Sequence, residues 1–226
     1  ELSALYEAFS RGRPSPLPDP SLHYADFASW QRQLLTEAEL APKLAYWKSH
    51  MAGFSDTPLP TDFPRPQNPT GQGAHVPVAF GIELVNKLRA LARRAGVSLF
   101  TTFLAAWKSL LLRYSGQSDI VVGAAAAGRA RPEFERSIGF FMNPLVLRTQ
   151  LDSTMSFVEL LPKVRDVLQA AREHQDVPFD RLVAALGVRR GPHEDPLYNN
   201  SFLLMPPVDM TPNWSVDRID IGVAKF

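Results

Sequence analysis

The feature that most constrains the fold is a predicted helix that is apolar on nearly every side. It spans residues 99–114, because Ser98 can cap its start and Gly116 marks its end. A helix of this kind is buried on most sides, so other elements must cover it. Lys108 interrupts the apolar surface, and we expect its amine to reach solvent along the alkyl stem.

Helices and strands alternate on both sides of this helix. An amphipathic helix is predicted over residues 83–94, followed by a left-handed cap at Gly96. Strands are predicted at residues 76–82, 119–123, 143–151, 201–205 and 214–223, and further helices at 156–174 and 178–186. Pro77 makes the first strand an edge or irregular one. The pattern predicts an α/β (α+β) layered domain.

The first third of the chain is rich in proline. Residues 13–20 and 58–70 are predicted to be extended connections, because proline fixes φ and removes a hydrogen-bond donor. The stretch between them, residues 24–51, is predicted to be helical, with a break at Pro42. The small residues 124–127, before Gly128, favour tight packing over close approach to a ligand.

Composition excludes several classes of protein. The chain has 226 residues, 45% of them hydrophobic, with 24 basic and 23 acidic side chains. It is too apolar for intrinsic disorder and too balanced for a dedicated nucleic-acid binder. The absence of cysteine excludes disulfides and thiolate sites, and no apolar run reaches the ~20 residues of a membrane helix. We therefore expect a cytoplasmic protein without membrane or nucleic-acid partners. Because the sequence has no initiator Met, we also expect it to be part of a longer chain.

The residues alone offer no complete active site. The sequence contains no G-x-S-x-G elbow, no G-x-G-x-x-G and no phosphate-binding loop. Its five histidines lack metal-ligand spacing, so we expect no metal site. His174 and Asp176 are two positions apart and would not face each other on a helix, so a structural role is favoured over a catalytic dyad.

Several stretches, in order, nevertheless resemble the motifs of nonribosomal peptide synthetase condensation domains. They are YADFASWQ at 24–31, PTDFPRP at 60–66, YSGQSDIVVG at 114–123 with AGR at 127–129, IGFFMNPLVLR at 138–148, HQDVPFD at 174–180 and DPLY at 195–198. Met142, Pro144 and Asp195 depart from the usual Val, Thr and Asn. The family's H-H-x-x-x-D-G signature is absent and is expected upstream of Glu1, so the catalytic histidine lies outside this chain.

The resemblance implies a layered sandwich of the chloramphenicol-acetyltransferase-like fold, with a mixed sheet covered by helices. Residues 1–70 would be N-terminal helices and a linker that joins the two halves of the parent domain, and residues 71–226 its C-terminal subdomain. The implied activity is amide formation, an acyltransferase step in secondary metabolism and antibiotic biosynthesis, in which an acceptor amine attacks a carrier-bound donor thioester. No cofactor would be bound directly, since donor and acceptor peptidyl carrier proteins deliver phosphopantetheine. An upstream condensation subdomain and an adenylation domain are the other implied partners.

Three alternatives remain at this stage. The parent domain can be a starter-type domain that N-acylates the first amino acid. It can also be a non-catalytic domain of the same fold that docks a carrier or tailoring enzyme. An epimerization domain shares the fold but fits residues 138–148 less well.

The resemblance also assigns the site residues. Arg148 is expected to pair with the aspartate of the upstream signature. Asn143 lies on the same strand and is expected either to face the other side or to brace the tunnel floor. Arg190 and Asp195 are candidates for active-site support. Arg129, a motif residue, and Arg190 are expected to serve subdomain contacts or acceptor binding, or to be solvated charges. The remaining motif residues are expected to be structural, with core packing for the aromatic members of the first motif: Tyr24, Asp26, Phe27, Trp30, Gly128, Gly139, His174, Gln175, Asp176, Pro178 and Phe179.

Overall fold

The computed structural model describes residues 1–55, 57, 59–64, 73–129, 131–188 and 196–205. In chain order the elements are α1 (Leu2–Ser10), α2 (Tyr24–Leu34), α3 (Glu37–His50), α4 (Ile82–Arg94), α5 (Leu99–Ser115), β1 (Asp119–Ala126), the 3-10 helix η1 (Pro132–Phe134), β2 (Asn143–Gln150), α6 (Phe157–Glu173) and α7 (Phe179–Leu186).

The sheet is mixed. β1 and β2 pair antiparallel, from Asp119 opposite Gln150 to Ala126 opposite Asn143. On the other edge of β1, Gly123 forms a parallel bridge with Ser201. The Gly123 N–H donates to the Asn200 carbonyl at 2.7 Å, and the Phe202 N–H donates to the Gly123 carbonyl at 2.8 Å. The strand predicted over 201–205 is therefore reduced to one bridge, and the strand predicted over 214–223 lies outside the described residues.

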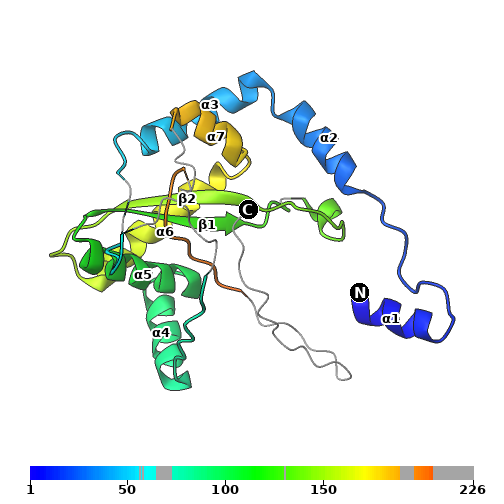
Figure 1. The fold of residues 1–226 in the computed structure, drawn as a ribbon, viewed down its shortest axis with the longest axis horizontal. Helices are drawn as coiled ribbons and strands as arrows, with labels where there is room; N and C mark the ends of the chain where they lie inside the picture. The colour runs from blue at the N-terminus through cyan, green and yellow to red at the C-terminus, as the bar shows by residue number, and fades with distance from the viewer. Residues whose placement is uncertain (56, 58, 65–72, 130, 189–195, 206–226) are drawn as a thin grey trace.

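Helices cover the sheet in layers, as predicted. Figure 1 shows α3 and α7 on one side of β1 and β2, and α5 and α6 on the other. One buried cluster joins the layers through apolar side chains of α3, α5, both strands, α6 and α7, including Trp47, Leu104, Val122, Leu147, Leu161 and Leu182. Trp47 and Met51 belong to this cluster although they precede residue 71. The division of the chain at residue 70 stays a prediction.

The predicted helix ends are largely confirmed. The Ser98 side chain accepts from the Thr101 N–H, and Gly116 ends α5 in the left-handed conformation. Ser156 and Glu159 form the expected capping box of α6. Among the described residues no single helix is long and apolar enough to cross a membrane; α4 and α5 pass that test only as a pair bent by 105°.

Three expectations were wrong. The break between helices falls at Thr36, whose side chain accepts from the Glu39 N–H, and Pro42 lies inside α3, where it removes only one intrahelical bond. Residues 76–81 form no strand, since no described segment pairs with them. Lys108 does not reach solvent: it is fully buried.

Candidate functional site

Asn143, at the start of β2, holds the turn between α6 and α7. Its Nδ2 donates to the carbonyls of Gln175 at 2.8 Å and Val177 at 2.7 Å. Its Oδ1 accepts from the Phe179 N–H at 3.1 Å. Because one amide side chain satisfies three backbone groups, the turn is fixed against the sheet. Asn143 therefore braces this turn, and its expected place at a tunnel floor stays a prediction.

The two ionisable residues of this turn make separate contacts. The His174 ring stacks on Tyr46 at 3.8 Å between centroids, and its Nδ1 lies 2.8 Å from the Ala170 carbonyl oxygen. Asp176 pairs with Lys43 of α3. The two side chains thus serve packing and an ion pair between elements. Pro178 precedes α7 as its N-cap residue.

The first motif builds a second, smaller aromatic cluster. Phe27 of α2 is buried against Phe134 and Phe141, and Trp30 packs on Phe134 with centroids 5.8 Å apart. The Tyr24 ring meets Phe141 edge-on at 5.1 Å but stays 38% exposed. Asp26 accepts from the His23 N–H at 2.8 Å and caps α2. The motif therefore attaches α2 to the segment between the strands.

Two glycines and an arginine shape that segment. A Cβ on Gly128, whose φ is +67°, would lie 1.7 Å from the Phe141 carbonyl oxygen, and one on Gly139 would lie 2.3 Å from the Tyr24 ring. The Arg129 guanidinium donates to the carbonyls of Phe134 and Ser137, and lies 4.2 Å from the Phe141 ring centroid. Arg129 thus braces this segment in the described structure.

The tight packing expected of residues 124–127 is found at Ala124 and Ala126, which are buried, but not at Ala125 and Ala127, which are exposed. A Cβ on Gly123 would lie 2.3 Å from the Tyr198 ring. Tyr198 belongs to the last motif, and its ring lies 6.0 Å from that of Phe179. Arg190 and Asp195, the other residues assigned to that region, lie outside the described residues.

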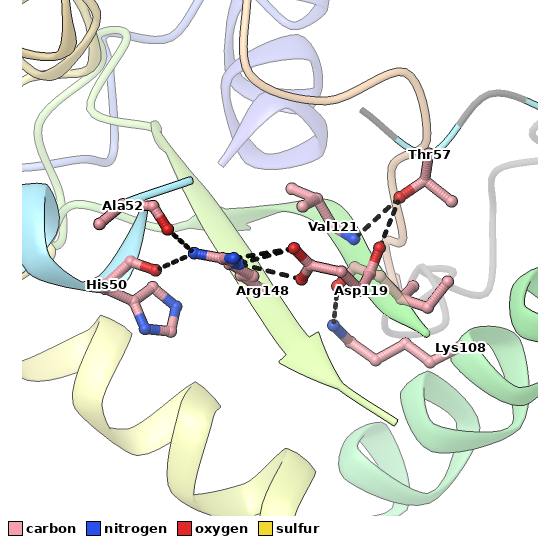
Figure 2. A network of polar contacts seen from close by, with 8 residues as sticks. His50, Ala52, Thr57, Lys108, Asp119, Val121 and Arg148 are labelled. Atoms are coloured by element: carbon pink, nitrogen blue, oxygen red, sulfur yellow. Dashed lines mark hydrogen bonds and ion pairs between the residues drawn. The ribbon is translucent and has the colours of Figure 1, made fainter. Parts of the chain in front are cut away.

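Arg148, at the far end of β2, is paired within this chain (Figure 2). Its Nε and Nη2 donate to the Asp119 carboxylate at 2.9 and 2.8 Å. Its Nη1 donates to the carbonyls of His50 and Ala52, each at 2.8 Å. The expectation named only an upstream aspartate, and it missed Asp119, which stands diagonally opposite Arg148 in the β1–β2 register. Arg148 therefore joins both strands to the end of α3.

Thr57 and Lys108 complete this polar network (Figure 2). The Thr57 hydroxyl accepts from the Val121 N–H at 3.1 Å, and its carbonyl accepts from the Asn200 amide at 3.1 Å. The Lys108 ammonium donates to the carbonyls of Ile120 and Leu147, one on each strand. Burial lowers the pKa of Lys108 to about 7, and the charge of Asp119 opposes that shift. Sequence reasoning gave no role to Thr57 or to Asp119, which it included only as part of the motif at 114–123. It noticed Lys108 in the apolar helix but expected its amine to reach solvent.

The chain matches the family model described as "Condensation domain" over residues 1–215. It is 44% identical over 214 residues to one of the linear gramicidin synthase proteins of Brevibacillus parabrevis, covering 94% of this chain and 4% of that protein. It is 40% identical to phosphinothricin tripeptide synthetase PhsC of Streptomyces viridochromogenes, covering 90% of this chain and 19% of that protein. The chain therefore spans a small part of these relatives.

Solved structures agree on the fold. The X-domain from teicoplanin biosynthesis superposes with a TM-score of 0.80 at 28% identity, over 88% of this chain and 46% of that one. The SgcC5 protein of Streptomyces globisporus gives a TM-score of 0.68 at 32% identity, over 81% of this chain and 41% of that one. With the family model matched over most of its length, the chain belongs to the condensation domain family of nonribosomal peptide synthetases.

Proposed function

We propose that the chain is the C-terminal half of a peptide-bond-forming condensation domain. The observation that carries this proposal is coverage: nearly the whole chain matches the family, yet it spans only 41–46% of solved relatives such as SgcC5 and the X-domain. The other half of such a domain would supply the H-H-x-x-x-D-G signature. Here Asn143, Arg148 and Arg129 act as supporting residues that hold the segments facing that half, and Arg190 and Asp195 stay predictions.

The proposed reaction is aminolysis of a thioester. The acceptor amine attacks the donor carbonyl carbon, the C–S bond breaks, and the proton lost by the amine goes to the leaving thiolate. Holding the two substrates together supplies much of the rate, since bound reactants behave as if at very high concentration. Donor and acceptor carrier proteins would bring both substrates on phosphopantetheine arms, beside an adenylation domain that loads them. A cytoplasmic location is part of this proposal.

The test compares the chain alone with the chain plus the upstream half of the same protein. Both are incubated with loaded donor and acceptor carriers, and the amide is measured by mass spectrometry. We expect product only when both halves are present. Amide above the uncatalysed background with the chain alone would refute the proposal. Running aminoacyl and fatty-acyl donors in parallel separates an internal domain from a starter-type domain.

A docking domain is the second candidate, and one observation favours it. The X-domain gives a higher TM-score than SgcC5, 0.80 against 0.68, and it was also solved in complex with OxyB. Its identity to this chain is 28%, whereas the gramicidin synthase proteins reach 44–46%. The similarity in sequence therefore favours condensation. A degenerate upstream signature, with no amide from the two halves together, would instead support docking.

A further inference from the structure

An open hollow of about 560 Å³ lies between α3, β2 and α6. Its lining includes His50 from α3, Arg148, Thr149 and Gln150 from β2, and Lys163 and Asp166 from α6. It lies at the opposite end of β2 from Asn143. The volume falls within the ~300–1,000 Å³ range of small-molecule sites. We call this space the α3–β2–α6 hollow.

Two polar atoms of its lining residues are buried without a partner among the described residues. They are the His50 Nε2 and the Thr149 Oγ1. Thr149 is only 4% exposed, and the His50 ring lies between β2 and α6 in Figure 2. A buried polar atom without a hydrogen bond costs free energy, and a bound group that accepts a hydrogen bond from it recovers that cost.

The electrostatic field at His50 is positive. The pKa of His50 is lowered mainly by burial and further by the positive charges of Arg148 and Lys108. The negative charge of Asp119 acts the other way and raises the pKa. A field that disfavours an added proton favours an anion. Lys163 adds a cation to the lining of the hollow. Asp166 is the carboxylate of the lining, and it pairs with Arg165 at 2.8 Å.

We propose that the α3–β2–α6 hollow binds a small anion, with His50 and Thr149 as hydrogen-bond donors and Lys163 as counter-charge. The shared chemistry is an oxyanion of one or two charges, either a carboxylate or a phosphate-like group. Arg148 contributes through its field, because its Nε and Nη1 are already bound to Asp119 and to backbone carbonyls. Tyr46, which stacks on His50 with planes 8° apart, fixes the orientation of the imidazole.

The test titrates sodium sulfate into the 226-residue chain at constant ionic strength set with sodium chloride. The readout is the side-chain NMR signal of His50, assigned among the five histidines by its loss in His50→Phe. That variant keeps an aromatic ring beside Tyr46. We expect a saturable shift in the wild type, weakened about tenfold in Lys163→Gln, since a charge-assisted bond is lost. Thr149→Val removes the buried hydroxyl at nearly constant volume and should weaken binding severalfold.

Lys48→Gln is the matched control. Lys48 is an exposed cation on the same helix as His50 and does not line the hollow, so its loss should change the affinity less than twofold. Parallel titrations with acetate and with inorganic phosphate distinguish a carboxylate from a phosphate-like ligand. The anion that binds more tightly identifies the class of ligand. The proposal is overturned if none of the three anions gives a saturable His50 shift, or if Lys48→Gln weakens binding as much as Lys163→Gln.

Discussion

At the residue scale, Lys108 shows how a buried cation can make stability depend on pH. Its folded pKa of about 7 lies below the ordinary value of 10.5. Between these values the unfolded chain binds the proton more tightly, so stability should rise with pH. The pKa of His50 is lowered from 6.5 and that of Tyr46 is raised from 10.0, so these two groups affect stability mainly below pH 7 and above pH 9.

We therefore predict that the chain is more stable at pH 9 than at pH 7, by about 2 kcal/mol. Lys108→Met, which keeps the length of the side chain, should abolish this dependence and raise stability at pH 7. Urea unfolding at both pH values measures the difference. An unchanged slope in Lys108→Met would show that another group causes the dependence.

Sequence reasoning succeeded at this scale where the interaction is local. Ser98, Ser156 with Glu159, and Gly116 cap helices through contacts within a few positions, so a short window of sequence contains both partners. It failed at Lys108, whose acceptors lie 12 and 39 positions away. A lone lysine on an apolar helix has the same local pattern whether it reaches solvent or two strand carbonyls.

At the element scale, the Arg148–Asp119 pair joins three elements: α3, β1 and β2. Its side chains are 10% and 21% exposed, so the pair is mostly protected from solvent. Arg148→Ala should cost about 3 kcal/mol, because Asp119 and two carbonyls lose their partner. Arg148→Lys should recover part of this, since a point charge cannot reach all these acceptors.

A double-mutant cycle with Asp119→Ala measures the pair itself. We expect a coupling of about 1–3 kcal/mol by urea unfolding of this chain. Zero coupling here, with coupling appearing only when the upstream half is added, would restore the original expectation of an upstream aspartate as the main partner.

Gly128 tests a second link between elements, the close approach of β1's end to the segment before β2. Gly128→Ala meets both a positive φ and the Phe141 carbonyl, so it should cost at least about 3 kcal/mol. Gly12→Ala is the matched control, because its φ is +65° and nothing lies within 4 Å of the added Cβ; it should cost only about 1–2 kcal/mol. Equal losses would show that strain, and not the contact, explains the glycine.

The elements predicted wrongly show the limits of local pattern. We predicted a helix break at Pro42, but the break lies at Thr36. An interior proline removes one hydrogen bond of the helix, and the packing of Leu40 and Trp47 in the core keeps α3 continuous. Residues 76–81 alternate as a strand does, but a strand also needs a neighbour to pair with, and periodicity says nothing about which segment supplies it.

At the scale of the whole molecule, the layered order of elements and the family motifs were sufficient to predict the fold class. The site was predicted only in part. Asn143, Gly128 and Arg129 were assigned from the motifs, whereas the fold determines the partners of Lys108 and of Asp119, although Asp119 also lies in a motif. What the sequence could not locate is the apolar surface that the described residues leave uncovered. It includes Tyr6 and Phe9 of α1 at 62% and 60% exposure, and Ile138 and Phe140 at 88% and 69%.

Ile138 and Phe140 carry the last prediction. The side chains of Ile138 and Phe140 are exposed, whereas the next residue, Phe141, is buried. Arg129 and Gly128 hold the backbone of this segment in place. The two exposed apolar side chains therefore have a fixed position on the surface. Such surfaces are typically covered by a partner, and the proposal above makes that partner the upstream half.

We expect the chain alone to self-associate, by light scattering, and to become monodisperse with that half. Ile138→Ser with Phe140→Ser should reduce self-association and also weaken binding of the upstream half, whereas Val158→Ser, at 58% exposure on α6, should change neither. A double variant that binds the upstream half as tightly as wild type would place the contact elsewhere on the molecule.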